Sequence, residues 1–116
     1  FVDFKLTRNG LWALDQRKKA LYHYKTDGNI DTRITLGPEI YSPVSFALGI
    51  DNIFYVLDRL DGTISAVDAR GHQKYTFLGS GQAQGKLYFP SEIRFDPWGQ
   101  LCVVDEGNGR VEIFSR

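Results

Sequence analysis

A short apolar run that ends on an aspartate occurs three times along this chain. The three copies are residues 11–15, 54–58 and 101–105. Their terminal aspartates, which are 43 and 47 residues apart, are Asp15, Asp58 and Asp105. Self-similarity at a fixed period of roughly 20–50 residues is typical of folds built from repeated units. The repeat therefore restricts the fold more than any other feature of the chain.

Each repeat predicts four short β-strands joined by tight turns. The strand-like runs alternate with a period of 2, and Gly, Asp and Asn occupy the turns. The expected strands are residues 2–6, 11–15, 20–24 and 32–36, then 44–48, 54–58, 63–67 and 74–78, and finally 91–95, 101–105 and 110–114. No window keeps apolar residues at helical spacing without a turn signal interrupting it. Four strands in a repeat of about 40–45 residues predict the blade of a β-propeller.

The last copy carries the fullest motif. Pro90 precedes an alternating strand, an Asp-x-x-Gly turn, a strand that ends Val-x-Asp at Asp105, and an Asn-x-Arg at Asn108 and Arg110. This pattern resembles an NHL repeat, although Gly109 stands where that family usually has a histidine. The two earlier copies lack the Asn-x-Arg. The resemblance implies an all-β fold, a propeller of four-stranded antiparallel blades that number six when the ring is complete.

The repeat also predicts how the chain is divided. Residues 1–42 form a blade whose first strand is truncated at its start, 43–89 a complete blade, and 90–116 a blade that lacks its outer strand. Together they make one partial propeller domain, because rings need about four to eight blades. We expect a fragment of a longer polypeptide. The alternative is a ring assembled from several short chains.

Composition restricts the class of partner. The chain carries 14 basic and 14 acidic residues, so it lacks the basic footprint of a nucleic-acid-binding face, and no nucleic acid is expected. No apolar stretch approaches the ~18 residues of a membrane span, so none is expected in this segment. The resemblance to bacterial NHL proteins favours an extracytoplasmic location.

The residues that recur with the repeat are expected to be structural. An aspartate at a strand end can accept N–H groups of the following turn, and Arg110 can pair with Asp105. A catalytic site is usually built from residues that differ between copies. We therefore interpret the repeat motif as scaffold: Asp15, Asp58, Asp105, Asn108 and Arg110.

Candidate binding residues lie on one rim and in the inner strands. Tyr41 and Tyr88 occupy equivalent places before the second and third blades, where they form a rim surface or pack over blade junctions. Asp3 and Glu92 lie in inner strands and could face the channel. Two acids are a small part of a Ca²⁺ site, so we expect no cofactor and keep calcium as the open alternative.

No other pattern in the sequence predicts a catalytic or metal site. His23 lies in the third strand of its blade and His72 in an outer hairpin, and neither has a zinc-binding spacing. The glycine-rich residues 79–86 lack the ending of a phosphate-binding loop and are interpreted as an inter-blade connection.

These observations favour a non-enzymatic scaffold that binds a protein or another macromolecule through a rim or face. Its partner would be another protein or the remainder of its own propeller. Propeller enzymes of similar architecture include amidating lyases, streptogramin-type lyases and calcium-dependent lactonases. The alternative is therefore a lyase or hydrolase, lactonase-like or amidating-lyase-like, whose metal site lies mostly in blades outside this segment.

Overall fold

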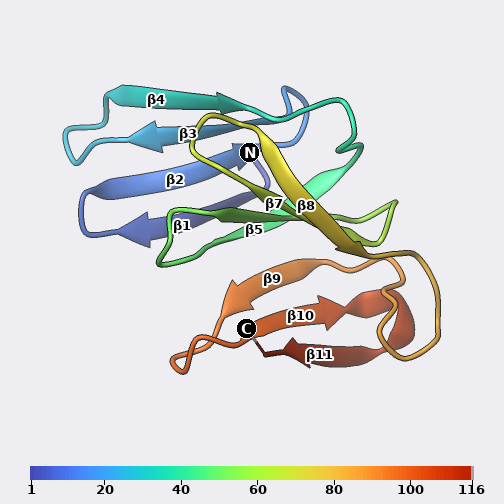
Figure 1. The fold of residues 1–116 in the computed structure, drawn as a ribbon. Helices are drawn as coiled ribbons and strands as arrows, with labels where there is room; N and C mark the ends of the chain where they lie inside the picture. The colour runs from blue at the N-terminus through green and yellow to red at the C-terminus, as the bar shows by residue number, and fades with distance from the viewer. Residues whose placement is uncertain (116) are drawn as a thin grey trace.

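The computed structural model describes residues 1–115, which form three antiparallel β-sheets arranged side by side (Figure 1). The first sheet contains β1 (Asp3–Thr7), β2 (Gly10–Asp15), β3 (Ala20–Tyr24) and β4 (Ile30–Thr35). The second contains β5 (Pro43–Leu48), β6 (Phe54–Asp58), β7 (Thr63–Val67) and β8 (Gln73–Leu78). The third contains β9 (Glu92–Phe95), β10 (Leu101–Asp105) and β11 (Arg110–Phe114), with the 3₁₀ turn η1 (Glu106–Asn108) after β10.

Each sheet is a meander in which consecutive strands are neighbours, so the four-strand unit predicted from the repeat is confirmed. The turns support this arrangement locally. Gly28 and Gly71 stand at equivalent places in the β3–β4 and β7–β8 turns, with φ angles of 89° and 87°. Side chains rarely adopt such angles, which explains why glycine recurs there although the residue before it changes.

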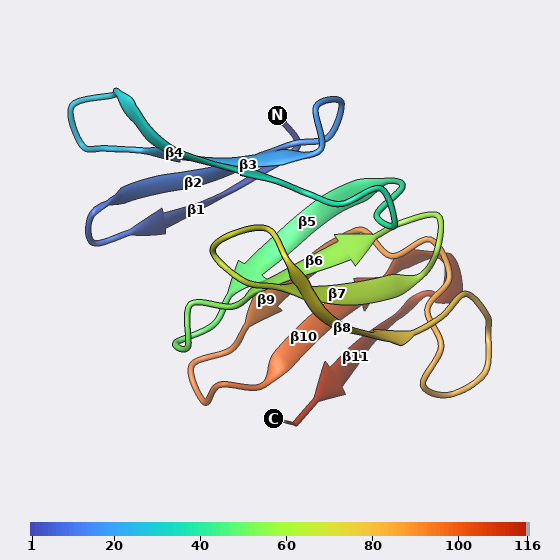
Figure 2. The ribbon, with the colours of Figure 1, turned by 45° about the horizontal axis from the view of Figure 1, so that its top comes forward.

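Apolar side chains fill two joints between the sheets. The first joint packs β2, β3 and β4 against β5, β6 and β7, with Leu14, Leu21 and Phe46 fully buried. The second packs the other face of the middle sheet against β9 and β10 around Leu57 and Ile93. Because the middle sheet is covered on both faces, every residue of β6 is buried. Figure 2 shows the first sheet at the top of the view, with the second and third sheets below it.

The inner strands β1, β5 and β9 are neighbours in that order and are the strands nearest the propeller axis. Their pairing with the second strand of each sheet has the same register. Asp3 pairs with Leu14, Ser45 with Leu57, and Glu92 with Val104, and each of these partners directly precedes the repeat aspartate. A register irregularity between Pro43 and Ser45 in β5 brings Ser45 into this position. The chain is thus an all-β partial propeller whose blades are the three sheets.

Candidate functional site

Three side chains at this shared register position meet near the axis. The Ser45 hydroxyl donates to Asp3 Oδ2 at 2.7 Å and lies 3.3 Å from Glu92 Oε1. Ser45 itself is fully buried. The two carboxylates that the sequence placed in the inner strands are therefore linked through one hydroxyl, and the structure adds Ser45 to them.

The same side chains also bind the main chain of the next sheet. The Phe46 N–H donates to Asp3 Oδ2 at 3.2 Å, and the Ile93 N–H donates to Ser45 Oγ at 3.0 Å. Each acceptor thus binds the amide one residue further along the neighbouring inner strand. This repetition makes the position a connection between blades.

The axial charges are paired with nearby cations. Lys5 Nζ lies 3.2 Å from Asp3 Oδ2, and Arg94 donates to Glu92 Oε2 at 2.6 Å. The Arg94 pair is the more exposed of the two. A carboxylate that already accepts an amide, a hydroxyl and an ammonium has few lone pairs left for a ligand. The contacts of Asp3 therefore indicate a structural role. Glu92 accepts fewer protein donors and has more lone pairs free for a ligand.

The repeat aspartates bind main-chain groups at the ends of the second strands. Asp58 Oδ1 accepts the N–H groups of Leu60 and Asp61, both at 3.1 Å, and its Oδ2 accepts that of Tyr41 at 2.8 Å. Asp15 is more exposed and accepts the Lys18 N–H at 3.0 Å. This hydrogen bond holds the pKa of Asp15 below its usual value.

Asp105, Asn108 and Arg110 fasten the connection that precedes the third sheet. Asp105 is fully buried and accepts the Tyr88 N–H at 2.7 Å, Asn108 Nδ2 at 2.8 Å and Arg110 Nε at 3.1 Å. Asn108 also donates to the Gly81 carbonyl. Arg110 donates to the carbonyls of residues 83 and 86. The motif of the last repeat therefore holds a glycine-rich loop that lies more than twenty residues earlier in the chain.

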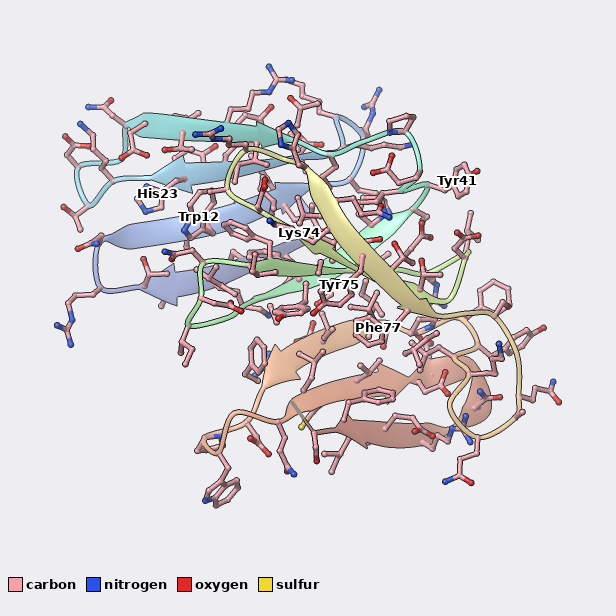
Figure 3. The ribbon with its side chains drawn as sticks, in the orientation of Figure 1. Trp12, His23, Tyr41, Lys74, Tyr75 and Phe77 are labelled. Atoms are coloured by element: carbon pink, nitrogen blue, oxygen red, sulfur yellow. The ribbon has the colours of Figure 1, made fainter. Side chains whose placement is uncertain are left out.

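The two rim tyrosines have different surroundings although their positions are equivalent. Tyr41 is 61% exposed (Figure 3), and Lys19 Nζ lies 5.9 Å from the centre of its ring. Tyr88 is half-buried and contacts the ring of Phe89 edge-on. Gly107 allows this closer packing, because a Cβ at Gly107 would lie only 2.6 Å from Tyr88 Cδ2.

Arg59 connects these two parts of the rim. Its backbone N–H donates to the Ser42 carbonyl, and its guanidinium donates to the Phe89 carbonyl at 3.0 Å and lies over the Phe89 ring. Glu106 accepts from the same guanidinium at 2.9 Å. We call this surface the aromatic rim; it comprises Lys19, Tyr41, Arg59, Leu60, Tyr88 and Phe89.

Neither histidine lies on an inner strand: His23 is on the third strand of its sheet, and His72 precedes the fourth strand of the next sheet. His23, on β3, is buried beside Trp12, and its Nδ1 lies 2.7 Å from Asp31 Oδ1 (Figure 3). The hydrogen bond with His23 lowers the pKa of Asp31. His72 is exposed in the turn before β8. Among residues 1–115, no group of three His, Cys, Asp or Glu side chains is placed to hold a metal ion.

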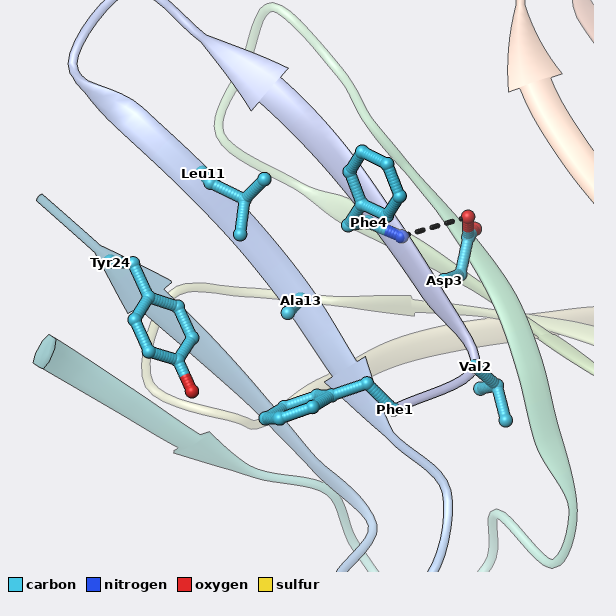
Figure 4. A pocket seen from close by; sticks show the side chains of 7 residues that line it. All are labelled: Phe1, Val2, Asp3, Phe4, Leu11, Ala13 and Tyr24. Atoms are coloured by element: carbon cyan, nitrogen blue, oxygen red, sulfur yellow. Dashed lines mark hydrogen bonds between the residues drawn. The ribbon is translucent and has the colours of Figure 1, made fainter. Parts of the chain in front are cut away.

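A hollow of about 560 Å³ lies on the outward face of the first sheet (Figure 4). Its lining is largely apolar and comprises Phe1, Val2, Asp3, Phe4, Leu11, Ala13 and Tyr24. The Phe4 N–H at its edge donates to Asp3 Oδ1 at 2.9 Å. Apart from Asp3, the lining offers no carboxylate or imidazole, so the hollow is suited to apolar packing.

Within the described residues, no helix has the length and apolar character needed to cross a membrane. No family model matches the chain, and a search of the curated proteins finds no match either.

Solved structures do resemble it. Two are of virginiamycin B lyase from Staphylococcus aureus, both 18% identical to this chain. The catalytically inactive variant with quinupristin has a TM-score of 0.62 and aligns over 93% of this chain and 38% of its own. A selenomethionine-substituted form has a TM-score of 0.61, with coverages of 97% and 40%.

A streptogramin B lyase structure is 15% identical, with a TM-score of 0.66 and coverages of 97% and 39%. The chain thus spans about 40% of the length of these structures. At this level of identity the likeness establishes the β-propeller fold.

Proposed function

We propose that this protein is a non-enzymatic propeller scaffold that binds another protein through the aromatic rim. The observation that carries the proposal is the exposed Tyr41 with Lys19 beside its ring, on the same rim as Arg59. Tyrosine and arginine are the residues that most often provide binding energy in protein interfaces. Leu60 adds a largely exposed apolar side chain to the same surface.

The pairing of polar groups elsewhere supports this choice. Near the axis, Asp3 and Ser45 accept amides of neighbouring blades, and at the rim Asp58 and Asp105 hold inter-blade segments. These groups are engaged in maintaining the fold. On the rim, by contrast, Tyr41 and Leu60 present most of their surface to solvent.

We further propose that the repeats are of the NHL type. The support is the triad in the third sheet, where Asp105 binds both Asn108 and Arg110. If all three residues have a structural role, the same motif can occur in repeats whose proteins differ widely in function. The boundaries at residues 42 and 89 and a ring of six blades remain part of this proposal.

Site-specific photocrosslinking tests the scaffold function. A photoreactive phenylalanine analogue at Tyr41 should yield a discrete protein adduct in the source cells, whereas the same analogue at Trp98, exposed on a hairpin at the opposite rim, should not. The purified partner should then bind the Tyr41→Ser variant at least about tenfold more weakly than wild type. Trp98→Ser is the matched control and should bind normally. Equal labelling from both positions, or full affinity of Tyr41→Ser, would refute binding through this rim.

A second candidate is a propeller lyase, favoured by the structural neighbours. The catalytically inactive virginiamycin B lyase carries a histidine-to-alanine change. In this chain both histidines lie in outer strands or turns, so Glu92 is the better-placed titratable group. Incubating the protein with quinupristin and divalent cations tests this function directly. Metal-dependent conversion of quinupristin would replace the scaffold proposal.

A further inference from the structure

The two ends of the stack of sheets each expose an apolar face. On the first sheet, the exposed Phe4 lines the hollow of Figure 4, and the exposed Leu6 lies two residues further along β1. On the third sheet, Val111 is 60% exposed and Ile113 and Val104 are also exposed. We call these surfaces the first-sheet face and the third-sheet face. Exposed apolar surface of this kind marks a place where another surface packs.

The strand register shows which face of the second sheet is equivalent to the first-sheet face, and what covers it there. Four of its residues pair along β1, β2 and β3 as four residues of the second sheet pair along β5, β6 and β7. The equivalences are Phe4 with Phe46, Leu11 with Phe54, Ala13 with Val56, and Tyr24 with Val67. All four second-sheet residues are buried against the first sheet. The hollow therefore lies on a face of the first sheet whose equivalent in the second sheet is covered by the neighbouring sheet.

The third-sheet face has the complementary character. By the same register, Val104 corresponds to Leu14 and Leu57, and Val111 to Leu21 and Ile64. In the two internal joints those leucines and isoleucines are fully buried against the next sheet. The chain thus carries one half of a blade joint on its first sheet and the other half on its third.

We propose that the third-sheet face binds the first-sheet face of a second copy of this chain. The contact is heterologous, and such contacts form closed rings when the rotation permits. Two copies bring six sheets together, within the range of about four to eight blades that propellers close with. Three copies would exceed that range, so the closed species is a dimer with two identical joints.

Polar groups near the axis fit the same joint. Asp3 accepts the Phe46 N–H, and Ser45 accepts the Ile93 N–H; Glu92 is the third member of that series. In the dimer Glu92 accepts the Phe4 N–H of the second copy, which in the single chain donates to Asp3. Arg94 and the second copy's Lys5 balance the two carboxylates that then approach one another.

Sedimentation velocity on the purified chain tests the proposal, with single charge substitutions on each face. Wild type should sediment as a species of twice the chain mass. Phe4→Asp and Val111→Asp should each weaken self-association at least about tenfold, because each places a carboxylate in an apolar joint. Both positions are exposed in the single chain, so the sheets should still form. Ile50→Asp, on a hairpin tip with its side chain 95% exposed, is the matched control and should dimerise normally.

Mixing the two variants distinguishes a heterologous joint from any other contact. In a mixed pair, one joint combines both altered faces and the other combines two unaltered faces. An equimolar mixture should therefore form a one-to-one pair that neither variant forms alone. Leu6→Asp and Ile113→Asp provide a second pair if a first variant lacks β-structure by circular dichroism. A monomeric wild type, irregular aggregation, or no pairing in either mixture would overturn the proposal.

Discussion

Replacing Asp58 by alanine should destabilise the fold strongly. The buried carboxylate accepts three main-chain N–H groups, at 2.8, 3.1 and 3.1 Å. A hydrogen bond to a charged acceptor contributes about 1.5–3 kcal/mol, and an amide left without a partner costs about 1–3 kcal/mol. Leu60 and Asp61 lie in an exposed turn where water can replace the carboxylate. We therefore expect a total loss of about 3–4 kcal/mol in the free energy of unfolding.

Urea unfolding followed by Trp12 fluorescence measures this loss, because the Trp12 ring lies 4.8 Å from that of Phe54 across the first joint. Protein concentration must be held fixed, since association shifts apparent stability. Asp58→Asn keeps an acceptor oxygen and should lose less. Asp15→Ala, at the equivalent but only half-buried site, should lose least. An Asp58→Ala variant within about 1 kcal/mol of wild type, or no less stable than Asp15→Ala, would show that the three hydrogen bonds of Asp58 do not stabilise the fold as expected.

Three further outcomes are expected. The amides of residues 70 and 72 bind Asp68, and the His72 bond is the main cause of its lowered pKa. Because the folded pKa lies below the unfolded one, Asp68 stabilises the protein above the unfolded pKa, and this stabilisation fades as pH falls through the folded pKa. Acid titration of Asp68→Asn should show a smaller loss of stability than wild type; an identical acid transition would contradict this. Gly107→Ala should lower the urea midpoint, because its Cβ would lie 2.2 Å from the Tyr88 carbonyl oxygen; Gly109→Asn, in open space, should change it little, and the reverse order would contradict the packing. Ser45→Ala should lower unfolding free energy by about 1–3 kcal/mol in urea titrations, since it leaves the amide of residue 93 without its acceptor; an unchanged midpoint would contradict this.

The strands could be predicted from the sequence because local alternation and turn residues determine them. Five of the six second and third strands have the predicted ends, namely β3, β6, β7, β10 and β11. β4 begins at Ile30 rather than at residue 32, because an outer strand with mostly exposed side chains has a weak apolar pattern.

The contacts between blades could not be predicted in the same way. Ser45 has no local signal, since its role depends on the register irregularity in β5 and on Asp3, 42 residues earlier. Tyr41 and Tyr88 look equivalent in the sequence, yet only Tyr88 faces a glycine that lets it pack down. The carbonyls that bind Arg110 could not be predicted either, because they belong to a loop 24 and 27 residues away in the sequence.

Side chains at recurring positions join the blades by binding main-chain amides. Residue-resolved hydrogen exchange of the Phe46, Ile93, Tyr41 and Tyr88 amides measures this binding. In wild type all four amides should be protected, and Ser45→Ala should speed exchange at Ile93 while leaving the two tyrosine amides protected. Rapid exchange of all four in the folded wild type, or no change at Ile93 in Ser45→Ala, would show that the blades are not joined in this way.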